Sequence, residues 1–206
     1  MTPNAQQAAE AGFVFPGALA GRRVVLDPVA AVDRALFDAL YGDPAVMAHV
    51  SEPLGGVRLV RAFDSALADT ADARGRRRLW RIRCGGDGAA VGLLGLTRGG
   101  PGLEVGVLLR VGVQGRGLAA DAIAAVARAV FAAPGVESLW ARHRQDHRAA
   151  AGLMRALDFR PAAASASGAG WAVWILPRPA YPGRDGSDTV TARTGRDAGP
   201  WPGKAA

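Results

Sequence analysis

The segment Gln114 to Ala119, with the sequence Gln-Gly-Arg-Gly-Leu-Ala, joins a predicted strand to a predicted helix. Glycines at positions 115 and 117 let the backbone approach a ligand closely. The first turn of a helix presents N–H groups without intrahelical acceptors, and its partial positive charge favours an anion. The order of these elements therefore predicts a diphosphate-binding loop, although a glycine pair after a strand also occurs in turns that bind nothing.

Two further features make this interpretation more specific. The spacing is Gln-x-x-Gly-x-Ala, with Arg116 inside it. Upstream, Glu104 shares one face of the strand with Gly106, whereas the alternate apolar residues from Leu103 to Leu109 face the core. The pattern resembles the cofactor loop of the GNAT superfamily of N-acetyltransferases, Gln/Arg-x-x-Gly-x-Gly/Ala. The resemblance extends over about residues 22–176.

A second segment is similar to another signature of the same superfamily. Leu139 to Ala150 reads Leu-Trp-Ala-Arg-His-Arg-Gln-Asp-His-Arg-Ala-Ala, and Leu153-Met154 and Leu157-Asp158-Phe159 follow. The family pattern is approximately Leu-Trp-Ala-x-x-x-x-x-Asn-x-x-Ser, then Leu-x-x-Leu-Gly-Phe. The entry segment, a strand and a helix before Asp43 to Met47, resembles the branch that includes the ribosomal-protein-alanine N-acetyltransferases.

The resemblance implies an acyl-CoA, usually acetyl-CoA, as co-substrate, and no metal. Its pyrophosphate would bind the backbone of Gly115 to Ala120. Its pantetheine arm would pair like an extra strand with residues 107–109, so this strand must splay away from the next one. Gly106 is compatible with a bulge there or with simple packing. The expected cofactor contacts are Val107, Leu108, Leu109, Gln114, Gly115, Arg116, Gly117, Leu118, Ala119, Ala120 and His147.

The implied reaction needs a neutral amine, a polarised thioester carbonyl and a thiol that can leave. Glu104 is the candidate general base, acting directly or through a water molecule. The equal alternative is a structural carboxylate paired with an arginine such as Arg110. His147 is the second candidate catalytic residue, holding the pantetheine or protonating sulfur, but a surface histidine at a helix start is the simpler explanation. His143 is a further candidate in the same region.

Several positions depart from the family pattern. The Asn and Ser of the second signature are replaced by His147 and Ala150, Met154 stands where other branches have a tyrosine acid, and Arg142 where some have a carboxylate. A CoA thiol with a pKa of about 8.5 does not strictly need an acid in order to leave. The first interpretation is thus an N-acyltransferase acting on a protein N-terminus or a small amine. The second is a catalytically degenerate acyl-CoA-binding sensor or interaction protein.

Composition argues weakly about partners. The net charge is +7, but Lys204 is the only lysine, so the arginine excess indicates a compositional bias of the source genome. The cluster Arg74, Arg76, Arg77 and Arg78 lacks interleaved aromatic residues, so a solvated turn is favoured over an RNA- or ribosome-binding surface, and no nucleic-acid partner is expected.

Compartment and membrane association can also be predicted. Cys84 is the only cysteine, which excludes an intrachain disulfide and suits a reducing compartment. No apolar run reaches the roughly 18 residues of a membrane span, and residues 1–10 carry no basic signal region. We therefore expect a cytoplasmic protein without membrane contact. The sequence leaves the amine, the acyl length and the oligomeric state open, a homodimer included.

The expected fold is α/β (α+β): a GNAT fold with a mixed, mostly antiparallel central sheet, a splayed strand pair and helices on both faces. The expected domains are a mobile extension at 1–20, the acyltransferase domain at 21–180 and a disordered tail at 181–206. Strands are predicted at 24–26, 79–84, 89–97, 103–109, 136–143 and 170–176. Helices are predicted through Val32, Leu36, Phe37 and Leu40, through 43–47, after a loop at 52–60, through 119–130, and after an Asp146 cap.

Overall fold

The protein is described by a computed structural model that covers residues 12–84, 88–99, 102–163 and 170–179. Its centre is an eight-stranded sheet in the order β1-β2-β3-β4-β5-β6-β8-β7. The strands are β1 (Leu19–Ala20), β2 (Val24–Pro28), β3 (Arg77–Cys84), β4 (Ala90–Gly99), β5 (Gly102–Leu109), β6 (Ser138–Arg144), β7 (Arg160–Pro161) and β8 (Trp171–Pro177). Every pairing is antiparallel except that of β5 with β6.

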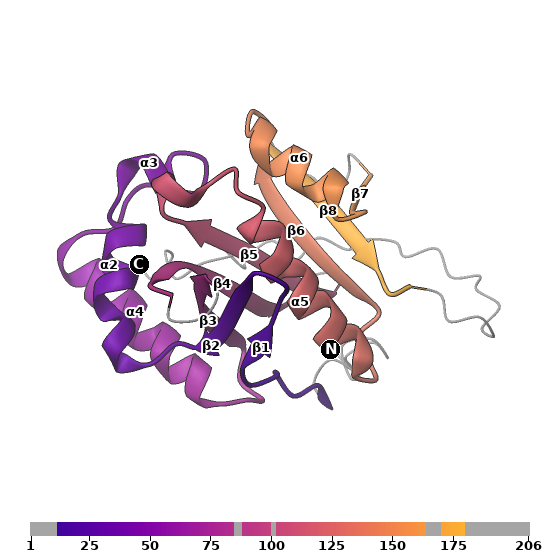
Figure 1. Ribbon diagram of the computed structural model, residues 1–206, viewed down its shortest axis with the longest axis horizontal. Coiled ribbons are helices and arrows are strands. Elements are labelled where there is room, and N and C mark those ends of the chain that lie inside the picture. Colours follow the sequence, from indigo (N-terminus) through magenta and orange to yellow (C-terminus); the bar gives the residue numbers. More distant parts are fainter. Residues whose placement is uncertain (1–11, 85–87, 100–101, 164–169, 180–206) are drawn as a thin grey trace, which may run out of the picture.

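Helices cover both faces of this sheet (Figure 1). They are α2 (Arg34–Tyr41), α3 (Pro44–Met47), α4 (Gly56–Ala71), α5 (Leu118–Ala132) and α6 (Arg148–Ala156), with 3-10 turns η1 (Ala31–Asp33) and η2 (Val111–Val113). Adjacent strand residues belong to different cores: Leu108 packs with α2 and α4, whereas Leu109 packs with α5. The predicted mixed, mostly antiparallel sheet between helices is confirmed.

The splay between β5 and β6 is also confirmed. These strands pair only at Leu103 with Leu139 and at Glu104 with Trp140. Beyond that point β5 continues to Leu109 with no β6 partner among the described residues, so its edge is open to another strand-like chain. The register of β4 with β5 runs without a shift through Gly106, which stands opposite Gly95, so the suggested bulge is wrong.

Several predicted boundaries need correction. Helix α4 begins at Gly56, so the expected loop at 52–60 is shorter than predicted. Val32 is 78% exposed and lies in η1, because the buried face of the helix starts only at Leu36. The arginine cluster is only partly solvated: Arg78 is buried and donates to the Thr70 carbonyl.

The domain begins before residue 20. Phe13 and Phe15 are 3% and 2% exposed and pack in the core beneath α5. Gly17 accepts a hydrogen bond of 2.7 Å from the indole of Trp80, and β1 pairs with β2. The predicted boundary at residue 20 therefore lies inside the packed domain. Residues 1–11 of the predicted extension and the predicted tail at 181–206 lie outside the described residues.

The sequence predicted no membrane-spanning segment, and the helices can be compared with that prediction. Within the described ranges, none of them is both long enough and apolar enough to span a bilayer.

Candidate functional site

The glycine-containing loop joins η2 to α5. Gly115 and Gly117 adopt left-handed conformations, with φ of 72° and 76°, and Gly117 is the N-cap of α5. A side chain at position 115 would meet nothing within 4 Å, so the loop faces open space. Both positions therefore use the conformational freedom of glycine to turn the chain into the helix.

The backbone amides of this loop are the feature of the site that most clearly indicates a bound anion. Among the described residues, the N–H groups of residues 115–120 donate to no protein acceptor; the Asp121 N–H, which donates to the Gly117 carbonyl at 3.1 Å, begins the regular helix bonding. The first N–H groups of a helix lack intrahelical acceptors, and here the preceding glycine loop adds the N–H groups of residues 115–117 to them. A row of such donors at the positive end of a 15-residue helix fits a phosphate group.

Two side chains brace the loop from either side. The Gln114 side chain donates to the Leu109 carbonyl at 3.0 Å and ties the loop to the end of β5. The Arg23 guanidinium donates to the Arg116 carbonyl at 2.6 Å and ties it to β2. The loop is thus held in shape without use of its own amides. Leu118 is 5% exposed, so only its backbone is placed to contact a ligand.

Asp121, in the first turn of α5, fixes the start of β2. Its carboxylate accepts the backbone amides of Arg22, Arg23 and Val24 at 2.9, 2.6 and 3.1 Å. Burial opposes ionisation, but these amides and the charge of Arg128 hold the pKa of the Asp121 carboxyl below its ordinary value. Asp121 is therefore ionised at neutral pH and ties the start of β2 to the first turn of α5, where its charge also faces the positive end of the helix.

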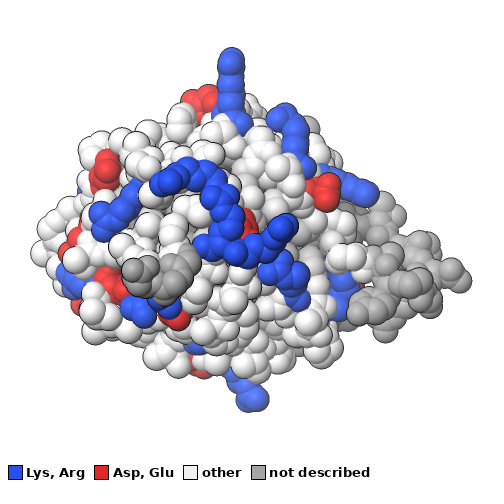
Figure 2. All heavy atoms as spheres, viewed as in Figure 1, with Lys and Arg blue, Asp and Glu red and all other residues white. Residues whose placement is uncertain are grey.

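The surface around the loop is positive. Figure 2 shows arginine side chains gathered over the start of α5 and the turn between β1 and β2. Exposed arginines in this region include Arg22, Arg23, Arg110 and Arg116. Such a field attracts phosphorylated ligands.

Glu104 lies where β5 and β6 begin to separate. It is 3% exposed, and its Oε1 lies 3.3 Å from Nε of Arg142. Burial raises the pKa of the Glu104 carboxyl to about 7, against the attraction of the Arg142 charge. Arg110 was the arginine suggested as partner; it is exposed beyond the end of β5, so that suggestion is wrong. A carboxyl that titrates near 7 is suited to accept a proton at neutral pH.

All three histidines of the chain come together beside α6. His147 stacks on His49 with ring centroids 4.4 Å apart, and its ring lies 6.2 Å from that of His143. Burial, then the nearby His49 and His143, lower the pKa of His147. His143 is buried, with Nδ1 2.7 Å from the Arg144 carbonyl. His49, in the segment after α3, was missed because nothing local in the sequence distinguishes it.

The predicted Asp146 cap is wrong. His147 is the N-cap residue of α6 and makes no side-chain capping bond, while the Asp146 carboxylate lies 3.5 Å from Nδ1 of His49. His147 is also half-buried, not a free surface residue. It thus lies at the interface between the α3 segment and the start of α6.

Residues 23–160 match the family model of the acetyltransferase (GNAT) domain. The chain belongs to this family. Among solved structures, an acetyltransferase from Agrobacterium tumefaciens str. C58 superposes with a TM-score of 0.68 and 23% identity, covering 78% of this chain and 94% of that one. Mycobacterium smegmatis RimJ in complex with CoA-disulfide gives 0.64 and 21%, covering 79% and 88%.

A spermidine N-acetyltransferase from Vibrio cholerae, in complex with CoA and spermine, gives a TM-score of 0.62 and 14% identity, covering 76% of this chain and 96% of that one. At such identities the likeness establishes the GNAT fold alone. No curated protein matches the chain.

The structure shows where the residues that depart from the GNAT pattern lie. Met154 is 5% exposed and packs in the core beneath α5, so no polar group replaces the family tyrosine there. Arg142 is the ion-pair partner of Glu104. Ala150 lies one turn into α6 and is half-buried. Among the described residues, no group of three or more His, Cys, Asp and Glu side chains is arranged to hold a metal ion.

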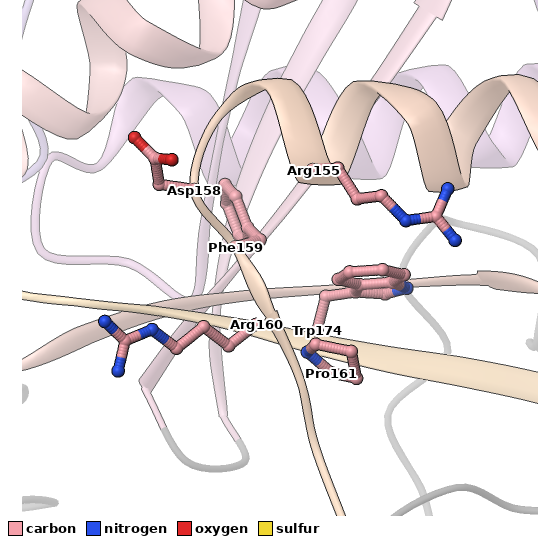
Figure 3. A pocket seen from close by; sticks show the side chains of 6 residues that line it. All are labelled: Arg155, Asp158, Phe159, Arg160, Pro161 and Trp174. Carbon is pink, nitrogen blue, oxygen red and sulfur yellow. The ribbon is translucent and has the colours of Figure 1, made fainter.

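A hollow on the surface of this GNAT domain lies at the C-terminal end of α6. It is lined by Arg155, Asp158, Phe159, Arg160, Pro161 and Trp174 (Figure 3). Arg155 lies over the Trp174 ring at 5.6 Å. Arg155 lies in the last turn of α6, Asp158 to Pro161 follow it, and Trp174 lies in β8. The Trp174 ring stacks 6.1 Å from the ring of His143, so this hollow borders the histidine cluster from the far end of α6.

Proposed function

We propose that this protein transfers an acetyl or other acyl group from acyl-CoA to a primary amine, on a protein N-terminus or a small molecule, by direct attack. The observation that carries the proposal is the row of amides at residues 115–120, which have no acceptor in the described part of the protein and lie beside the splayed edge of β5 and a buried carboxyl. The amides of residues 115–120 bind the pyrophosphate. The pantetheine pairs with residues 107–109, and the thioester reaches the splay near Glu104.

In the proposed reaction the amine nitrogen attacks the thioester carbonyl carbon, and the carbon–sulfur bond breaks. Glu104 accepts the proton that the amine loses, directly or through a water molecule. Its pKa of about 7 lets it exchange protons near neutral pH. Backbone N–H groups of β5 polarise the carbonyl. The thiolate leaves without a required acid, since its pKa is about 8.5.

The branch is part of the proposal. The entry segment Asp43 to Met47 resembles the ribosomal-protein-alanine type, for which the acceptor is a protein N-terminus. Asp43 caps α3 by accepting the Ala45 N–H at 2.8 Å, so this segment holds a defined position. A second candidate function is an acyl-CoA-binding protein without turnover. It is supported by the departures from the family pattern at Arg142, Ala150 and Met154.

The test separates binding from chemistry. Calorimetry with desulfo-CoA is expected to give saturable binding, and thiol release with acetyl-CoA and a panel of peptides and small amines is expected to identify an acceptor. Binding without thiol release across the panel would favour the second candidate. No binding of desulfo-CoA would overturn both.

His147→Ala tests the remaining site residue. Because burial and the neighbouring histidines lower the pKa of His147, its ring is neutral near pH 7 and is better suited to hold the pantetheine than to protonate sulfur. We expect the KM for acetyl-CoA to rise by about fivefold, the loss of roughly one hydrogen bond, with a smaller change in kcat. His49→Ala is the matched control, because it removes the stacked ring but leaves His147 in place. Unchanged turnover and KM in His147→Ala would remove His147 from the mechanism.

A further inference from the structure

One face of β6 and β8 carries two arginines on a shared aromatic ring. In the antiparallel register, Arg142 stands opposite Val173 and Arg144 opposite Trp171. The Arg142 and Arg144 guanidinium carbons lie 5.3 and 5.4 Å from the centre of the Trp171 ring. Each distance is within the range of a cation–π contact, so the indole holds both cations at one place.

The two arginines are connected to Glu104, the candidate base, by direct contacts. The Arg142 side chain is 24% exposed and reaches inward to Glu104, whose side chain is 4% exposed, while Arg144 is exposed at the end of β6. A line of contacts therefore runs from the buried carboxyl through Arg142 and Trp171 to Arg144. An amine placed to lose its proton to Glu104 has these guanidinium groups as near neighbours.

The charge of this surface is one-sided. Neither β6 nor β8 contains a carboxylate, and Glu104 is buried against Arg142. Asp146, in the turn after β6, lies against His49. A second ammonium group on the acceptor would be repelled by the two arginines, whereas an anion would be attracted, and guanidinium groups bind carboxylates in a bidentate geometry.

We propose that the acceptor is a primary amine that also carries a carboxylate, which Arg142 and Arg144 bind beside the Trp171 ring. This inference rests on the proposed acyl transfer and narrows its acceptor class. The carboxylate comes either from an acidic residue next to a peptide N-terminus or from a free acidic amino acid.

Matched acceptors test it. The dipeptide amides Ala-Glu-amide and Ala-Gln-amide have the same amine, and only the first carries a carboxylate. Free glutamate and glutaminamide, in which both carboxyl groups are amides, make the same comparison for a free amino acid. We expect the wild-type protein to prefer the carboxylate member of at least one pair by about tenfold or more in kcat/KM, and the preference to decline with added salt. A preference within the peptide pair alone assigns the peptide source. A preference within the free pair alone assigns the amino-acid source.

Arg144→Gln supplies the second arm, because Arg144 is exposed and its loss leaves the Glu104 and Arg142 pair in place. The carboxylate preference should fall below about threefold, with the KM for acetyl-CoA unchanged. Arg74→Gln is the control: it removes the same charge from an exposed arginine in the turn before β3, three strands away from β6, and should keep the preference.

Two results would overturn the inference while the proposed function stands: equal or better use of the acceptors without a carboxylate, or a preference that survives Arg144→Gln. Absence of thiol release with every amine would overturn the proposed transfer itself, and the acceptor assignment with it.

Discussion

Glu104→Gln should lower kcat/KM for the acceptor amine by about 10² to 10⁴, the usual contribution of a general base, and leave the affinity for acetyl-CoA unchanged. The glutamine side chain keeps the shape of the buried residue but cannot accept the proton. CoA affinity is expected to hold because the loop at 115–120 is separate from Glu104 and is braced by Gln114 and Arg23. Steady-state rates of thiol release, with each substrate varied, measure both parameters.

Glu104 should also determine how activity depends on pH. Because the pKa of Glu104 is about 7, activity should rise with pH through that value as the carboxylate forms. The amine acceptor also gains reactivity as it deprotonates, at about pH 8 for a peptide N-terminus. In Glu104→Gln the limb near 7 should disappear and the amine limb should remain. Removing the charge of Arg142 should move the lower limb to higher pH.

The contribution of Glu104 to the free energy of unfolding should decrease as pH rises, whereas activity increases. The folded-state pKa of Glu104 is raised above its ordinary value of 4.5, so the folded state binds the proton more tightly than the unfolded state. This contribution to the free energy of unfolding is fully present below pH 4.5 and is lost as pH rises through about 7. Urea titrations of wild type and Glu104→Gln over this range measure it.

Glu137→Gln is the matched control for these experiments. Glu137 is 56% exposed and lies 3.9 Å from Arg178, so its replacement should change neither the rate nor the pH limb near 7. A wild-type rate in Glu104→Gln would show that Glu104 is a structural partner of Arg142, which is the other interpretation that the sequence allowed.

The conformation of the loop at 115–120 could be predicted because its determinants are adjacent in sequence. A strand ending at Leu109, glycines at 115 and 117, and an apolar helix stripe fix a local path that tertiary contacts only brace. The splay followed from the family pattern, and the structure adds its starting point at Glu104 and Trp140.

The partner of Glu104 could not be predicted in the same way. Its neighbour Arg142 belongs to the next strand of a parallel pair, and the register of such a pair is set by packing through the intervening helix α5. The sequence offered only a nearby arginine in the same chain segment, Arg110, which the turn after β5 carries away.

The contact between the histidines was not predicted from the sequence, and the N-terminal boundary of the domain was predicted too late in the chain. His49 and His147 meet across the fold, and no local pattern encodes a contact between segments so far apart. Residues 12–20 lie in a chain start rich in alanine, glutamine and glycine, which suggested mobility. The alternation of Phe13 and Phe15, whose side chains are both buried, was the signal for a packed segment.

Gly117→Val should weaken CoA binding by about 10- to 100-fold, the effect of placing a β-branched residue in a left-handed conformation that costs L-residues at least about 1 to 2 kcal/mol. Gly117 has φ of 76° and is the N-cap of α5, so a shift of its backbone turns the amides of residues 115–120 away from one another. A Cβ there would also lie 3.2 Å from the Arg23 guanidinium. Calorimetry with CoA measures the loss, and kcat at saturating acetyl-CoA should change much less.

Two companion variants distinguish backbone conformation from side-chain bulk. Gly112→Val places the same side chain in η2, where φ is not left-handed and a Cβ meets nothing within 4 Å, so CoA affinity should stay near that of wild type. Gly117→Asn should lie between, because asparagine tolerates the left-handed region. If Gly117→Val binds CoA as tightly as wild type, the loop amides are not the pyrophosphate site. An equal loss in Gly112→Val would instead indicate crowding by the side chain, because only Gly117 requires the left-handed backbone.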